Sequence, residues 1–307
     1  MLAALSASLW VVFTIAASAA QTARNVMQRD LVRALGTAGA THVRFLFSLP
    51  FIVALFAIQT LVLGMKPPAL NVASVAWIAS GVVSQAVATG LMLAGMRQRS
   101  FVVVTAYTKV EPMVIALFGV IFLGDALGFA MAVAILIATA GVVLMSWPQA
   151  LPPTDAAQDP GANWKAAALG LSGGALFALS ATSYRGALLE MGDASAAMKA
   201  TTALTIGLSI QSTMILVWLG AFDRPTLRAI GRDWRRSLFA GFMGALASQF
   251  WLMAFALANA AAVRTLALIE VPMAQVVTRR LFKQGATLRE YIGMGLLLLG
   301  LALLLNA

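Results

Sequence analysis

The chain contains no cysteine and only one histidine, His42, among its 307 residues. Without cysteine there is no disulfide, no thiolate nucleophile and no thiolate metal site. A single histidine also excludes His-cluster metal sites and a Ser-His-Asp triad within one chain. No phosphate-binding loop is present either. We therefore expect a protein that is not an enzyme, holds no metal or cofactor and does not use ATP directly.

Charged residues are also scarce, at 10% of the chain, whereas 61% of the residues are hydrophobic. Soluble domains carry about 25% charged residues. The apolar runs continue for about 20 residues without the alternation of a membrane β-strand. This composition predicts an all-α integral membrane protein. The net charge of +10 comes mainly from loops and span ends, so it indicates a partner bilayer and no nucleic acid.

Ten such runs predict ten membrane-spanning helices. They cover residues 2–23, 42–63, 72–95, 101–124, 126–147, 164–188, 195–220, 238–258, 261–281 and 286–305. A segment rich in proline and aspartate, residues 148–163, predicts a linker between two halves, 1–147 and 164–307. Five spans is an odd number, so the second half would enter the membrane inverted relative to the first. This is the inverted-repeat plan of many secondary transporters.

Polar residues lie inside two of these spans at matching places. Lys109, Glu111 and Pro112 interrupt the fourth span, and Glu270 and Pro272 interrupt the ninth. A charge at the centre of a membrane helix costs roughly 2.5–3.5 kcal/mol on insertion scales, so these side chains should face a protein interior or a watery cavity. Because Lys109 and Glu111 are two residues apart, they point to different sides of a helix, and each requires a partner on another helix.

The segment T-K-V-E-P-M-V-I-A-L-F-G-V-I-F-L-G-D, residues 108–125, resembles a pattern of the EamA branch of the drug/metabolite transporter superfamily, L-x-x-x-E-P-x-x-x-x-L-x-x-x-x-L-x-E. Glu111 and Pro112 occupy matching positions, Asp125 replaces the terminal glutamate, and Arg44 also matches a common family position. The resemblance implies a ten-helix transporter that exports or takes up small metabolites, amino acids among them, without catalysis.

The second half departs from this pattern. Val271 separates Glu270 from Pro272, and Gly285 stands where the terminal acid would be. Only the first copy carries an adjacent Glu-Pro step, so the polarity of a site enclosed by the two halves should lean toward the fourth span.

Two further spans offer candidate lining residues. In the first span Trp10, Thr14, Ser18, Gln21 and Asn25 follow one another by three or four residues, which places them on one helical face. Lipid disfavours such a face, so it should point inward. In the eighth span Trp251 lies mid-span and is the best aromatic candidate for a cavity, whereas the glycines of that span favour close helix packing.

These residues together predict a substrate site and a gate. We expect substrate binding by Trp10, Thr14, Lys109, Glu111, Trp251 and Glu270, and gating at Pro112 and Pro272. A lysine, a carboxylate and aromatic surface suit a zwitterion with an apolar side chain. The purely structural alternatives are that Glu111 pairs with Lys109 or with a neighbouring helix to hold the bundle together, and that buried hydroxyls bond to the preceding helical turn.

The sequence therefore favours a multi-pass secondary transporter of the inner (plasma) membrane. It would export small amphipathic or zwitterionic metabolites such as amino acids by alternating access, with protons as a candidate coupling ion. Two alternatives stay open. One is a multidrug exporter of lipophilic cations, which would use Glu111 and Glu270 with aromatic stacking. The other is a membrane scaffold that transports nothing.

Orientation follows from the basic residues. Sixteen of the 21 lysines and arginines fall on one side of the ten predicted spans, against Lys66, Arg185, Lys199 and Arg264 on the other. The positive-inside rule then predicts that the loops after spans one, three, five, seven and nine are cytoplasmic, with both termini outside. The family resemblance implies the opposite, both termini inside.

Overall fold

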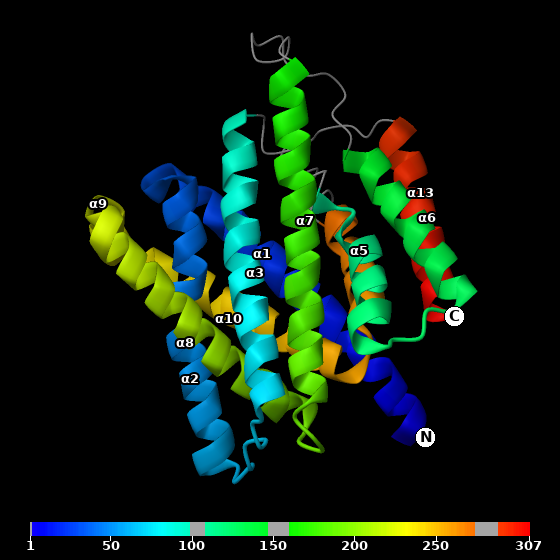
Figure 1. Ribbon diagram of the computed structural model, residues 1–307, viewed down its shortest axis with the longest axis horizontal. Helices are drawn as coiled ribbons and strands as arrows, with labels where there is room; N and C mark the ends of the chain where they lie inside the picture. The colour runs from blue at the N-terminus through cyan, green and yellow to red at the C-terminus, as the bar shows by residue number, and fades with distance from the viewer. Residues whose placement is uncertain (1, 99–107, 147–159, 274–287) are drawn as a thin grey trace. The chain divides into compact units, whose positions relative to one another are not determined.

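The computed structural model describes residues 2–98, 108–146, 160–273 and 288–307 (Figure 1). All regular secondary structure in these residues is helical, so the all-α prediction is confirmed. The longer helices are α1 (Leu2–Leu46), α3 (Val72–Gln98), α6 (Phe129–Ser146), α7 (Pro160–Leu189), α8 (Ala196–Phe222), α10 (Trp234–Leu257) and α13 (Leu288–Leu305). The shorter ones are α2 (Leu49–Ala57), η1 (Ile58–Val62), α5 (Glu111–Phe118), η2 (Gly119–Leu123), α9 (Arg224–Arg232), α11 (Ala260–Leu266) and η4 (Ala267–Ile269).

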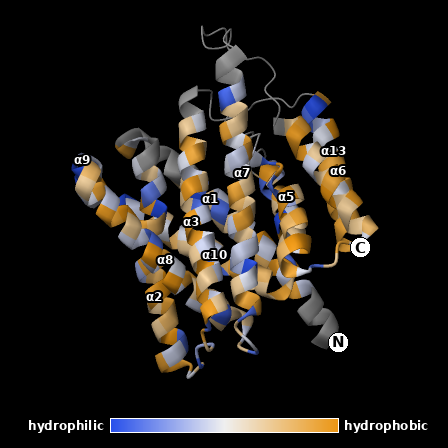
Figure 2. Cartoon of the chain, in the orientation of Figure 1, coloured by the Kyte–Doolittle hydropathy of each residue, from blue (hydrophilic) through white to orange (hydrophobic). Residues whose placement is uncertain are grey.

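Six helical segments are long and apolar enough to cross a membrane, judged by length and composition. They are Gly39–Val62, Val72–Gly95, Trp164–Leu189, Ala196–Phe222, Trp234–Leu257 and Leu288–Leu305. Two shorter apolar helices, Glu111–Leu123 and Phe129–Met145, accompany them. Hydrophobic residues cover most of these helices in Figure 2. The chain is thus a multi-pass membrane protein, whereas the ten-helix inverted repeat stays a prediction.

Helix α1 extends well beyond the first predicted span. It continues to Leu46 and is interrupted only at Gly36, where φ is 69° and ψ is 171°. This left-handed φ is open to glycine because it lacks a Cβ, so the chain changes direction there. On the predicted inward face Thr14 and Ser18 are fully buried. Asn25 is exposed instead and accepts a hydrogen bond from Arg24, so that end of the predicted face does not point inward.

Contacts between helices group the chain into two compact units. The first unit consists of residues 1–82 and 183–258, and the second of residues 83–182 and 259–307. Each unit combines helices from both sequence halves, and α3 and α7 contribute to both units. The predicted halves describe a repeat along the sequence, so these packing units neither test nor exclude them. Of the predicted linker, residues 148–159 lie outside the described residues, and the rest begins α7.

The first unit is built on α1, α8 and α10. α1 packs against α10 and α8, and α2 packs against α8. Its glycines allow the close approach that the sequence suggested: a Cβ on Gly241 would collide with Phe47, and one on Gly244 would lie 2.8 Å from the Ser48 hydroxyl oxygen. The same hydroxyl donates to the Gly241 carbonyl oxygen at 2.8 Å, which ties α10 to the start of α2.

The second unit contains α5, α6, α11 and α13. α13 lies along α6 (Figure 1), and α11 packs against both α5 and α6. A Cβ on Gly141 of α6 would lie 2.6 Å from the Gly293 carbonyl oxygen, and one on Gly300 of α13 would lie 2.5 Å from the Ala138 nitrogen. The α6–α13 pair therefore depends on glycine at the contact. Helix α6 also contacts α5 and α11, the two helices that carry or adjoin the charged residues of the fourth and ninth predicted spans.

Candidate functional site

Helix α5 begins at the polar stretch of the fourth predicted span. Lys109 and Val110 form a turn, and α5 starts at Glu111 with Pro112 in its first turn. The Val110 carbonyl oxygen accepts from the Met113 backbone N–H at 3.0 Å. We predicted that Pro112 would interrupt a helix running through this point. Instead the interruption lies at Lys109 and Val110, and Pro112 occupies a position where its missing N–H costs no helical hydrogen bond.

The polar stretch of the ninth predicted span is also irregular. Asn259 caps α11, since its side-chain oxygen accepts from the Ala262 backbone N–H at 2.7 Å. After α11 the chain tightens into the 3₁₀ turn η4, followed directly by Glu270 and Pro272 in a helical segment that is described up to Met273. Proline has no N–H to donate one turn back, which disfavours a continuous α-helix here. A 3₁₀ turn within a helix often marks a hinge.

Two ion pairs join these irregular segments. The Lys109 ammonium nitrogen, Nζ, lies 3.0 Å from Glu270 Oε1. The Arg264 guanidinium of α11 meets both carboxylate oxygens of Glu111, with Nε 3.0 Å from Oε1 and Nη2 2.9 Å from Oε2. The packing of α5 on α11, visible in Figure 1 where α5 lies beside the orange segment, brings the four side chains together. We call Lys109, Glu111, Arg264 and Glu270 the charge quartet.

The quartet is electrically balanced. The α5 segment supplies one cation and one carboxylate, and the α11 segment does the same, so each cation meets the carboxylate of the other segment. The Arg264–Glu111 pair is bidentate, a geometry that makes charge-assisted hydrogen bonds strong and directional. The Lys109–Glu270 pair has a single contact and is the weaker of the two ion pairs. Balanced pairs of this kind are what apolar surroundings require, because an uncompensated charge there is costly.

The quartet is not sealed off. The side chains of Lys109 and Glu270 are 19% and 20% exposed, and those of Arg264 and Glu111 are 23% and 14% exposed. Protein atoms therefore leave part of each charged side chain uncovered. Where water covers this surface, it screens the charges and lowers the energetic value of each pair.

In the first unit, two of the predicted site residues lie on α1. Trp10 is half-buried, and Thr14 is fully buried. The Thr14 hydroxyl donates to the Trp10 carbonyl oxygen at 2.7 Å. The Thr14 contact is the bond to the preceding turn that the purely structural alternative foresaw. It leaves a substrate role for Thr14 untested.

The third predicted residue of the first unit, Trp251, lies on α10 with only 7% of its surface exposed. Its indole N–H donates to the Gln21 side-chain oxygen of α1 at 3.3 Å, and its ring stacks on Phe255 with the centroids 6.5 Å apart. Trp251 thus contacts the polar face of α1 through Gln21, as expected of an inward-pointing residue.

Sequence reasoning placed three members of the quartet in the site and missed the fourth, Arg264. The structure brings Lys109, Glu111 and Glu270 together in the second unit, with Pro112 and Pro272 next to the two acids. In the sequence Arg264 entered only the count of basic residues for orientation, and it lies six residues before Glu270. The sequence did contain a signal that could have identified Arg264. Each polar stretch has one cation and one acid, which is what pairing between the two stretches requires.

Comparison with known proteins supports a transporter. A sequence profile described as the EamA-like transporter family matches residues 4–147. One solved crystal structure shares the fold, with a TM-score of 0.71 at 12% sequence identity, over 97% of this chain and 94% of its own. No curated protein sequence matches the chain. The likeness in structure extends over both sequence halves, whereas the profile covers the first.

Proposed function

Because residues 4–147 belong to the EamA-like transporter family, we propose that the whole chain is a secondary transporter of ten helices in two inverted five-helix repeats. It exports small amphipathic or zwitterionic metabolites such as amino acids across the inner membrane by alternating access. The observation that carries this proposal is the charge quartet, in which two irregular helical segments hold two cations and two carboxylates that protein atoms cover only in part.

A zwitterion matches the charges of the quartet. Its ammonium group can replace the Lys109 ammonium at Glu270, while its carboxylate binds the freed Lys109. The protein charges stay compensated throughout, which a single-charge ligand cannot achieve. A lipophilic cation at Glu270 would leave Lys109 without a counter-ion, so the cation-exporter alternative is the less favoured one.

Alternating access requires the two segments to move, and their backbone irregularities are the proposed hinges. Pro112 lies in the first turn of α5, and Pro272 follows the 3₁₀ turn η4. Substrate binding would open the single Lys109–Glu270 contact first, because the bidentate Arg264–Glu111 pair is the stronger one.

Protons are the coupling ion that we propose. Protonation of Glu270 would release Lys109 without leaving a buried negative charge, and the same holds for Glu111 and Arg264. Export from proteoliposomes should then follow an imposed proton gradient. Export that continues unchanged after a protonophore collapses the gradient would exclude this coupling while leaving the substrate proposal intact.

A thermal-shift screen of the purified protein tests the substrate class. Ligands that bind only the folded state raise the apparent unfolding temperature. We expect amino acids to raise it in the wild-type protein and to lose this effect in the double variant Lys109→Gln/Glu270→Gln, which removes the two proposed ligand-binding charges and keeps the local charge balanced. Stabilisation by organic cations alone would favour the drug-exporter alternative. No stabilisation by amino acids, nucleotide sugars or organic cations would favour the scaffold.

A further inference from the structure

Helix α9 is too short to cross a membrane, yet it lies between two helices that are long enough, α8 and α10. Nine residues of α-helix span only about 14 Å. The Asp223 side chain caps the helix by accepting from the Thr226 backbone N–H at 3.2 Å. Pro225 occupies the first turn, where proline is favoured. The chain is thus built to form a separate helix here and not a frayed end of α8.

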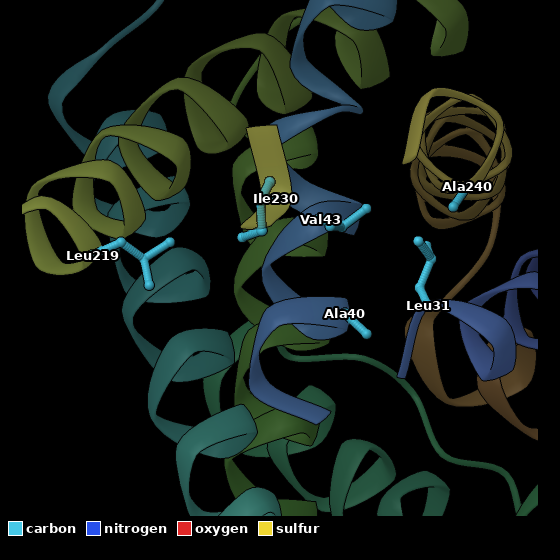
Figure 3. Close-up of a cluster of buried hydrophobic side chains, with 6 residues drawn as sticks. All are labelled: Leu31, Ala40, Val43, Leu219, Ile230 and Ala240. Atoms are coloured by element: carbon cyan, nitrogen blue, oxygen red, sulfur yellow. The ribbon is translucent and has the colours of Figure 1, made fainter. Parts of the chain in front are cut away.

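One side of α9 is anchored in the first unit. Ile230 is buried in a cluster with Leu31, Val43 and Leu219, and Leu227 packs against the same cluster. Figure 3 shows the Ile230 side chain beside α1 and α8 residues of this cluster. The anchoring fixes which face of α9 is turned away from the protein.

The opposite side of α9 is strongly basic. Arg224, Arg228 and Arg232 follow one another at intervals of four residues, so they lie along one helical face. Arg235 and Arg236 come next, at the start of α10, and all five arginines are exposed. In Figure 2 the outer end of α9 is hydrophilic, in contrast to the apolar helices beside it.

These arginines have no acidic partner in the described part of the chain. Arg224 Nε donates a hydrogen bond to the Gly220 carbonyl oxygen at 2.8 Å, and the Arg235 guanidinium lies over the Trp234 ring, 5.4 Å from its centroid. Two aspartates, Asp223 and Asp233, fall within residues 223–236, so five arginines minus two aspartates leave a local charge of +3.

Exposed aromatic residues flank the basic face. Phe222 precedes α9 and is 79% exposed, and Trp234 follows it and is 47% exposed. Aromatic rings next to basic side chains are typical of the membrane–water interface, where the ring enters the acyl boundary and the cation meets the headgroups. By the charge distribution, the loop that holds α9 is expected on the cytoplasmic side.

We propose that α9 and the start of α10 form a docking surface for anionic phospholipid headgroups. The phosphates would bind across Arg228, Arg232 and Arg235, while Phe222 and Trp234 hold the helix in the interface plane. Basic clusters beside a membrane helix attract anionic lipid in this way, and the attraction weakens as salt screens the charges.

The test measures lipid binding to the full chain. The protein is reconstituted in nanodiscs of phosphatidylcholine or of equal parts phosphatidylcholine and phosphatidylglycerol, and retained lipids are counted by native mass spectrometry. We expect selective retention of phosphatidylglycerol. The variant Arg228→Gln/Arg232→Gln/Arg235→Gln should bind it about a hundredfold more weakly, as expected for three basic residues at an anionic surface.

A matched control removes the same charge elsewhere. Lys66→Gln/Lys165→Gln/Arg289→Gln neutralises three exposed cations that belong neither to α9 nor to the start of α10, and should retain phosphatidylglycerol as the wild type does. Equal retention by both triple variants would overturn the proposal. So would competition by inorganic phosphate or by a soluble oligonucleotide at equal strength, because the surface would then bind polyanions in general. Single variants Arg228→Gln and Arg232→Gln give a graded loss if the triple variant folds poorly.

Discussion

At the residue scale, the crossed pairing of the quartet decides what each substitution does. Removing one charge leaves its partner uncompensated, whereas removing a whole pair keeps the site balanced. The cost of the first change exceeds the cost of the second because burial penalises the orphaned ion more than it rewards the pair. The bidentate pair should respond more strongly than the single-contact pair.

Glu111→Gln should therefore destabilise the protein by about 2 kcal/mol, below the range for fully buried pairs because the pair is partly exposed. Glu111→Gln/Arg264→Gln should recover most of this loss. Unfolding midpoints of the two variants in detergent measure the difference. A double variant as unstable as the single one would mean that the Arg264 charge is compensated by some group other than Glu111.

The sequence predicted part of this arrangement at the residue scale. The two-residue spacing of Lys109 and Glu111 showed that each requires a partner on another helix. Which partner it meets depends on the packing of α5 against α11, and no local pattern encodes that. Thr14 illustrates the same limit: its position on the inner face was predictable, but its hydrogen bond to Trp10 competes with any ligand contact.

At the element scale, the close contact between α6 and α13 allows a direct test of packing in the second unit. Gly300→Ala would place a methyl group 2.5 Å from the Ala138 backbone nitrogen. We expect a destabilisation of about 1–3 kcal/mol, typical of overpacking. Gly295→Ala on the same helix is the control, since no heavy atom lies within 4 Å of its Cβ. Unfolding midpoints that fall equally in both variants would contradict the packing.

The 3₁₀ turn before Pro272 gives a second prediction for an element. Pro272→Ala restores a backbone N–H that can bond to Leu268 and favours a straighter helix. We expect a protein at least as stable as the wild type with a lower transport rate, because the hinge is stiffened. Pro50→Ala, in the first turn of α2, should change neither property. Unchanged transport by Pro272→Ala would exclude a hinge at this position.

At the scale of the whole molecule, long apolar runs predicted the class correctly, because bilayer thickness fixes the length of a spanning helix. Packing of the helices into units was not predictable, since apolar surfaces of similar width fit many neighbours. The units combine helices from both sequence halves, a long-range outcome to which close glycine contacts such as Gly241 against Phe47 contribute.

Orientation is a prediction for the whole chain. The distribution of lysine and arginine predicts that the loop containing α9 lies in the cytoplasm and that both termini lie outside. A reporter fused to the C-terminus that is active only outside the cytoplasm checks this. A reporter that stays inactive on a fusion protein present in the membrane would contradict the charge argument and favour the orientation that the family resemblance implies.

The central claim is that the charge quartet binds the substrate and does not merely hold helices together. Exchange of the weaker pair, Lys109→Glu/Glu270→Lys, separates these roles, because it restores an ion pair but presents exchanged charges to a zwitterion. The measurement is amino-acid transport in proteoliposomes that contain equal amounts of folded wild-type and exchanged protein. We predict transport lower by at least about tenfold, the loss of one charge-assisted contact. Transport at the wild-type rate would contradict the claim and leave the quartet as a structural clasp.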